Sequence, residues 1–65
     1  MNVLINNLPQ ILPLGATLAD AVALLQAQPP FAAALNKAFV PRAQYSHTLL
    51  HEADNVEIIH PVTGG

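Results

Sequence analysis

Two consecutive glycines, Gly64 and Gly65, close the sequence and are its strongest candidates for chemistry. Glycine has no Cβ, so a backbone that ends in two glycines can enter a slot too narrow for any other residue. The free carboxylate of Gly65 would then be presented to reagents inside a second protein. The plain alternative is a frayed, disordered terminus. The residues that precede the pair decide between the two interpretations.

The composition excludes several other kinds of site. None of the 65 residues is cysteine, which excludes disulfides, a thiol nucleophile and a thiolate zinc site. Charged residues make up 9% of the chain and its only fixed cations are Lys37 and Arg42, which argues against nucleic-acid binding and a polybasic membrane anchor. No apolar run approaches the roughly 18 residues of a spanning helix, and the N-terminus lacks a cationic signal-peptide start. We therefore expect one soluble, cytoplasmic domain that binds neither nucleic acid nor membrane.

The three histidines offer a weaker candidate, a metal site. His47 and His51 are spaced i, i+4, so a helix would place both on one face. No cysteine assists them, and we expect solvated or half-buried histidines rather than a metal site. His60 lies where the final strand becomes the tail, and a surface position is favoured there over a partner contact.

The apolar pattern predicts a small α+β domain that would hold the tail. Alternating apolar residues near both ends of the chain predict an opening and a closing strand. A second strand returns beside the first, at a sheet edge because Pro13 has no N–H. The segment 41–51 is irregular or contains a short helical turn, anchored by Tyr45, Leu49 and Leu50. The expected strands span residues 1–6, 10–14, 33–35, 38–40 and 56–60.

One helix is predicted after the second strand, covering one face of a mixed sheet. Thr17 caps its start, and the carboxylate of Asp20 lies in the first turn, where the helix dipole favours negative charge. Two prolines end the helix by residue 28. If the last strand lies parallel beside the first, its C-terminal end projects freely from the sheet. The expected core comprises Val3, Ile5, Leu18, Val22, Leu25, Leu35, Val40, Val56 and Ile58.

This arrangement makes residues 1–60 a folded domain and residues 61–65 a flexible tail that projects from the last strand. Fully extended, these five residues reach roughly 16–18 Å, enough to enter the active site of a neighbouring enzyme. With 52% hydrophobic residues, so small a domain leaves apolar surface exposed, which usually marks a partner site.

A few short motifs are more specific than the apolar pattern. They are the opening strand, the segment Leu35-Asn36 followed by Phe39-Val40-Pro41-Arg42, the aromatic Tyr45, the acidic turn before Val56, and Gly64-Gly65. In these motifs the whole chain resembles the ThiS/MoaD family of sulfur carriers, and within it the carriers of thiamine biosynthesis. The resemblance implies a ubiquitin-like β-grasp fold. The chain departs from the family at Ala53, where these carriers often have glycine, and at Tyr45, where they often have tryptophan.

The resemblance also implies a chemical role. In that family a ThiF-like partner enzyme uses ATP to adenylate the terminal carboxylate, which is Gly65 here, while Gly64 is its neighbour in a narrow channel. Sulfur from a persulfide donor then displaces AMP, and the resulting thiocarboxylate supplies a ThiG-like thiazole synthase. The carrier itself needs no catalytic residue, no metal and no intrinsic cofactor. We therefore expect a monomeric carrier that is not an enzyme.

Three residues are candidates for partner binding. Ile59 points away from the core side of the final strand, and packing on a second face is its equally favoured alternative. Val62 lies in the tail, where docking is slightly favoured. Arg42 either contacts an acidic partner or solvates a turn, and the turn is slightly favoured.

Two other functions stay open on these residues. One is a sulfur carrier for another pathway, such as the small subunit of molybdopterin synthase or a carrier for cysteine biosynthesis. The other is a ubiquitin-like interaction module in which Gly64 and Gly65 are incidental.

Overall fold

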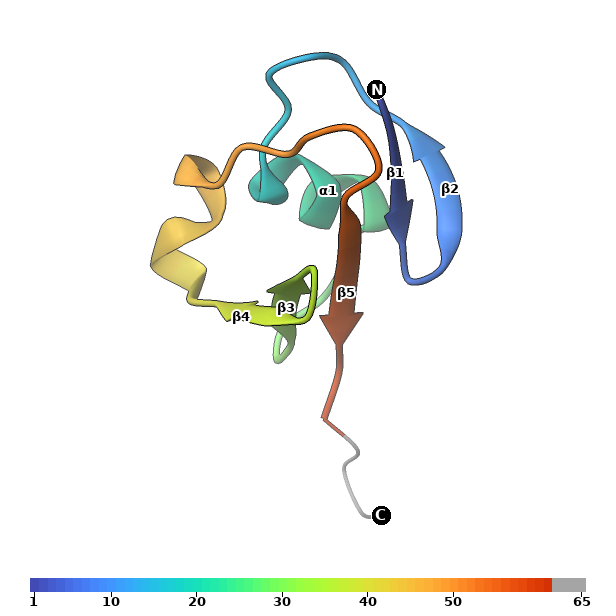
Figure 1. Ribbon diagram of the computed structural model, residues 1–65. Helices are drawn as coiled ribbons and strands as arrows, with labels where there is room; N and C mark the ends of the chain where they lie inside the picture. The colour runs from blue at the N-terminus through green and yellow to red at the C-terminus, as the bar shows by residue number, and fades with distance from the viewer. Residues whose placement is uncertain (62–65) are drawn as a thin grey trace.

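The structure, a computed structural model, describes residues 1–61, in which five strands form one mixed sheet and one α-helix packs on it (Figure 1). The strands lie in the order β2-β1-β5-β3-β4, and the central strand β5 is parallel to its neighbour β1. The first and last strands are therefore parallel neighbours, the arrangement on which the sequence interpretation made a projecting C-terminal end conditional. The elements are β1 (Asn2–Ile5), β2 (Leu8–Ile11), α1 (Leu18–Leu25), β3 (Ala32–Leu35), β4 (Ala38–Val40), the 3₁₀ helix η1 (Arg42–His47) and β5 (Asn55–Ile59).

The turn between β1 and β2 contains only two residues, Asn6 and Asn7. Their φ angles are 51° and 67°, the left-handed pair that a two-residue hairpin turn requires. Asparagine tolerates this region better than most residues. β2 consequently begins at Leu8, and the strand predicted over residues 10–14 is wrong in both bounds.

The edge position predicted for the second strand is confirmed, because β2 pairs only with β1 in the described sheet. The proline inside the strand is Pro9, opposite Leu4, whereas Pro13 follows the strand. Met1 and Leu12 exchange two hydrogen bonds, of 2.7 and 2.9 Å, through their backbone N and O atoms. Because bonded and non-bonded pairs alternate along an antiparallel ladder, the nitrogen of Pro9 faces outward, where no donor is needed.

The start of α1 is capped as predicted. The side chain of Thr17 accepts a 3.4 Å hydrogen bond from the N–H of Asp20, whose carboxylate in turn accepts a 2.8 Å bond from the N–H of Thr17. This reciprocal capping box satisfies two N–H groups that the helix leaves free. Gln26 ends the helix in the left-handed region, at φ 56°. At eight residues, α1 leaves the described chain with no helix long enough to cross a membrane.

The buried face of α1 differs from the predicted one. Leu18 and Ala21 are buried, whereas Val22 is only partly buried. Leu25, predicted to be in the core, is 37% exposed in the last turn. A helix of about two turns presents its i and i+3 residues to the sheet, and the next turn lies at the margin. Leu35 in β3 is likewise only partly buried.

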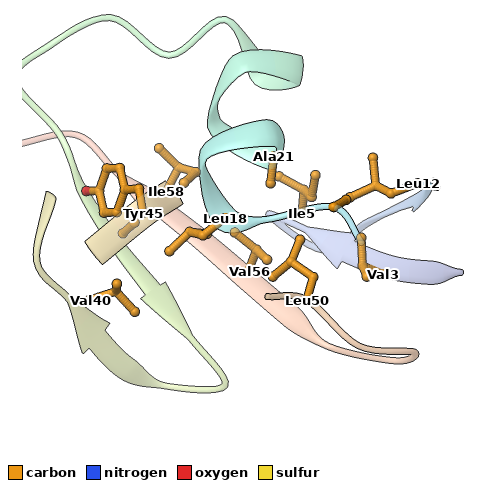
Figure 2. Packing of buried hydrophobic residues seen from close by; sticks show 12 residues of the cluster. Val3, Ile5, Leu12, Leu18, Ala21, Val40, Tyr45, Leu50, Val56 and Ile58 are labelled. Atoms are coloured by element: carbon orange, nitrogen blue, oxygen red, sulfur yellow. The ribbon is translucent and has the colours of Figure 1, made fainter. Parts of the chain in front are cut away.

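The core lies between α1, η1 and the inner face of the sheet (Figure 2). Leu18 and Val56 are its largest fully buried side chains. Tyr45 and Leu50 anchor the segment after β4, as predicted, but Leu49 is 55% exposed and does not. The buried residues are Val3, Ile5, Leu12, Ala16, Leu18, Ala21, Ala33, Val40, Tyr45, Leu50, Val56 and Ile58.

Candidate functional site

β5 is the strand that leads toward the predicted reactive tail. On its β1 side, the N–H of Asn6 donates a 2.9 Å hydrogen bond to the carbonyl oxygen of Val56. Asn6 Oδ1 then accepts a 2.8 Å hydrogen bond from the N–H of Ile58. On the other side β3 pairs with β5 as far as Ile59. The strand is thus held on both sides almost to its end, and the chain leaves the sheet at His60 and Pro61 (Figure 1).

Three predicted site residues, Val62, Gly64 and Gly65, lie outside the described residues. Their roles stay predictions. The site that the structure describes is therefore the surface around the last residues of β5.

One side of the sheet faces away from α1, and we call it the open face. Ile59 lies on this face, 54% exposed, opposite to the buried Val56 and Ile58, so its predicted direction is confirmed. Exposed apolar side chains extend across the whole sheet here, because no element within residues 1–61 covers them. The large exposed apolar side chains of the open face are Leu4, Ile11, Phe39 and Ile59.

The part of the open face nearest the tail has a distinct shape. Phe39 in β4 pairs with Ala34 in β3, and Ile59 in β5 pairs with Ala32 in β3. Paired residues of antiparallel strands point to the same face, so two methyl groups lie between the larger side chains. Glu57, which pairs with Ala34, adds one carboxylate. The result is a low apolar floor between Phe39, which is 70% exposed, and Ile59.

Beside the end of β5 lies a group of aromatic rings. Phe31 stacks on Tyr45, with ring centroids 6.1 Å apart and an interplanar angle of 18°. The ring of His60 lies against the same Phe31, with centroids 6.0 Å apart and a tilt of 54°. His60 is exposed, as expected for a surface residue. A hollow of about 250 Å³, which we call the aromatic hollow, is lined by Pro29, Pro30, Phe31, Arg42 and Tyr45.

Arg42 is the first residue of η1 and is exposed to solvent. Its position in the wall of the aromatic hollow places it near the end of β5. Within residues 1–61 the only contact between a basic side chain and a carboxylate joins His51 Nδ1 to Asp54 Oδ2 at 3.8 Å. The described part of the chain therefore supplies no carboxylate partner for Arg42.

His47 and His51 do not share a helix. His47 is the last residue of η1, and His51 follows the buried Leu50. The i, i+4 geometry that a metal would need is thus not formed. Among residues 1–61, no group of three or more histidine, aspartate or glutamate side chains could hold a metal ion.

The carboxylates of the acidic turn before β5 accept hydrogen bonds from other residues of the fold. Glu52 Oε1 accepts a 2.9 Å hydrogen bond from the N–H of Asn2, which lowers the pKa of the Glu52 carboxyl. Asp54 accepts hydrogen bonds from the N–H of His51 at 2.7 Å and from Asn36 Nδ2 at 3.1 Å. These carboxylates fasten the start of β5 to β1 and to the β3–β4 turn, at the opposite end of the strand from His60.

A larger hollow, of about 540 Å³, also lies at that opposite end. Met1 and Glu52, which line it, precede the parallel strands β1 and β5. It is therefore remote from the point at which the chain leaves the sheet. Although it is the larger hollow, it does not adjoin the end of β5 that leads to the tail.

Sequence reasoning missed two aromatic residues of this surface. Phe39 had a usable signal, because strand alternation places it opposite to the buried Val40. Phe31 had none, because its contacts with Tyr45 and His60 join three separate segments of the chain.

Comparisons with known proteins agree with this geometry. The model of the ThiS family matches residues 3–65. A crystal structure of the thiamine biosynthesis protein ThiS from Geobacter metallireducens matches with a TM-score of 0.82 and 20% sequence identity, covering 100% of both chains. At that identity the likeness shows the fold, an α+β β-grasp. A search of curated proteins found no match.

Proposed function

The chain belongs to the ThiS family of sulfur carriers in thiamine biosynthesis, and we propose that it carries sulfur as a thiocarboxylate on Gly65. Carriers of this family are not catalysts and have no intrinsic cofactor, and the family implies partners of the ThiF and ThiG types. The observation that carries the proposal is the end of β5, which is held by its neighbours on both sides, while His60 and Pro61 continue beyond the sheet.

The proposed chemistry takes place inside the partners. The carboxylate oxygen of Gly65 attacks the α-phosphorus of ATP, and pyrophosphate leaves. A persulfide sulfur then attacks the carbonyl carbon of the acyl adenylate, and AMP leaves. A thiol reductant cleaves the remaining S–S bond, so that Gly65 keeps one sulfur as a thiocarboxylate. Activation is needed because a carboxylate is a poor electrophile, whereas AMP is a good leaving group.

In this proposal residues 61–65 act as an arm on a rigid base. Five extended residues reach roughly 16–18 Å, which is enough to bring Gly65 to a buried active site. Gly64 keeps the arm narrow next to the reacting group, because any Cβ there would widen it. The arm begins at Pro61, directly after the aromatic contact of His60.

We assign docking of the ThiF-type enzyme to the open face near the arm. Phe39 and Ile59 are exposed and apolar, and the alanine floor between them admits an apolar side chain of the partner. Exposed apolar patches usually mark interaction sites, and aromatic residues often contribute most to binding. Val62, in the arm, would extend this apolar contact toward the active site.

Intact-mass measurement tests the proposal. The protein is incubated with a ThiF-type enzyme, ATP, a persulfide donor and a thiol reductant. A mass gain that corresponds to replacement of one oxygen by one sulfur is the expected result, and fragmentation should place it on Gly65. An unchanged mass, under conditions that convert a known carrier, would contradict the assignment.

A further inference from the structure

The aromatic hollow is a surface feature that the proposed chemistry does not use. Its volume of about 250 Å³ falls below the roughly 300–1,000 Å³ of typical small-molecule sites. A single side chain from another protein therefore fits it better than a nucleotide or a cofactor. Its walls are two prolines and two aromatic rings, and its charged group is the guanidinium of Arg42.

The charge of this hollow is unusual for the molecule. Lys37 and Arg42 are the only fixed cations in a chain whose net charge is −2. Lys37 lies in the β3–β4 turn. Asn36 of the same turn donates a hydrogen bond to Asp54, near the start of β5. Arg42 lies instead beside Phe31, whose ring contacts His60 after the end of β5. The two cations are thus at opposite ends of β5.

The side-chain carboxylates within residues 1–61 do not reach Arg42. Asp20 is bonded at the start of α1, and Glu52 and Asp54 are bonded in the turn before β5. Glu57 points to the open face. Within residues 1–61 the guanidinium therefore has no anionic partner, although aromatic and proline walls adjoin it.

These surroundings favour a carboxylate ligand. A guanidinium binds a carboxylate through two parallel hydrogen bonds, a geometry that lysine cannot offer. An ion pair fully exposed to water contributes little. Apolar walls exclude water from one side of the pair and so lower the local dielectric constant, which strengthens the attraction.

We propose that the aromatic hollow receives a glutamate or aspartate side chain of the adenylating partner. This inference rests on the proposed function, because the partner meant is the enzyme that adenylates Gly65. The side chain would come from the rim of the channel that admits the arm, since His60, which touches Phe31, directly precedes Pro61. The contact fixes where the carrier sits while the arm is threaded, and it takes no part in the chemistry.

Two charge-reversal variants provide a matched test. Arg42→Glu and Lys37→Glu change the net charge equally, and only the first alters the hollow. The readout is ATP–pyrophosphate exchange by a ThiF-type enzyme, with the carrier as the varied substrate. Arg42→Glu should raise KM by about tenfold or more with kcat unchanged, and Lys37→Glu should stay within about twofold. High salt should reduce the difference in KM between the wild type and Arg42→Glu, because salt screens the attraction between Arg42 and the partner's carboxylate.

Equal KM values for the two variants would overturn the proposal. A lower KM for Arg42→Glu would also overturn it, and would indicate that the guanidinium holds the chain's own terminal carboxylate. Arg42→Gln, which keeps most of the side-chain volume, should give an intermediate KM, and thermal melts must show that all variants fold. Failure of the wild type to be adenylated would instead contradict the proposed function, so the two failures are distinguishable.

Discussion

Asn6 Oδ1 accepts a hydrogen bond of 2.8 Å from the backbone N–H of Ile58, across a separation of 52 residues. β1 has ended at this level, so the side chain of a turn residue takes the place of a neighbouring strand. The same asparagine donates its own N–H to the carbonyl oxygen of Val56. One turn residue thereby extends the support of β5 toward the point at which the chain leaves the sheet.

Replacing Asn6 should therefore weaken the fold through one lost acceptor. Asn6→Gly keeps the positive φ but leaves the partly buried N–H of Ile58 without a partner, which should lower the free energy of unfolding by about 1–2 kcal/mol. Asn7→Gly is the matched control, because its backbone conformation is similar. That variant should be neutral or slightly stabilising in urea unfolding. Equal losses for both variants would contradict the role given to the side chain.

Ala53 is strained in the turn before β5. Its φ is 69°, in the left-handed region that costs a residue with a Cβ about 1–2 kcal/mol. Ala53→Gly relieves this strain. It also makes the unfolded chain more flexible, which lowers the free energy of unfolding by about 0.4–1 kcal/mol. A net stabilisation of about 0.5–1 kcal/mol is expected in urea unfolding. Ala23→Gly, in the interior of α1, should instead destabilise by about 1 kcal/mol. A lower free energy of unfolding for Ala53→Gly than for the wild type would contradict the claim that Ala53 is strained.

Glu52 should make stability depend on pH in the acid range. The hydrogen bond from the N–H of Asn2 lowers the pKa of this carboxyl below its ordinary value of 4.5. A lowered native pKa means that the contribution is fully present above the unfolded value and is lost as pH falls through the folded value. The stability difference between wild type and Glu52→Gln should therefore shrink as the pH is lowered from 7 through about 4.5 toward the folded pKa. Thermal melts across this range measure it, and a difference that grows on acidification would exclude the predicted linkage.

Ile59 is expected to dock the adenylating partner. Ile59→Ser removes apolar contact area beside the arm and should raise the KM for the carrier by about tenfold, or about 1.4 kcal/mol. Ile11→Ser is its control on the same open face, because Ile11 pairs with Asn2, at the start of β1 and away from the arm. The control should change KM by less than about twofold. A comparable effect of both variants would place docking elsewhere.

Gly64 and Gly65 should be essential for activation and dispensable for folding. Gly64→Val adds branched bulk beside the reacting group and should abolish thiocarboxylate formation in the mass assay. Deletion of Gly65 should do the same, while the thermal midpoint should stay unchanged if Gly65 belongs to a free arm, because the described residues 1–61 already form a core. Normal activation of Gly64→Val would argue against a narrow channel, and a large drop in the midpoint on deletion would argue against a free arm.

The sequence predicts the elements that depend on local pattern. Val56 and Ile58 alternate with polar or exposed neighbours, so the last strand and its core face could be recognised. The Thr17 cap was also predicted, because a threonine directly before an apolar helical repeat is a local signal. Asp20 was placed in the first turn for the helix dipole, and its reciprocal hydrogen bond with Thr17 was not predicted. The start of β2 was not predicted correctly. It depends on Asn6 and Asn7 both adopting positive φ, which composition alone does not determine.

The features missed depend on tertiary contacts. Periodicity identified an apolar stripe on α1 but not its rotation, which buries Ala21 and leaves Leu25 exposed. The aromatic hollow assembles residues from the loop before β3 and from η1, so no spacing along the chain reveals it. Arg42 was a candidate from its motif, but its surroundings came only from the fold.

The two edge strands of the described sheet have a consequence for how copies of the molecule behave together. β2 carries Pro9, which offers no donor to an incoming backbone, and β4 is three residues long and is followed by Pro41. Both features disfavour pairing of an incoming strand with either edge, and so disfavour fibril growth by strand addition. The molecule can therefore expose the apolar side chains of the open face with little tendency to form fibrils.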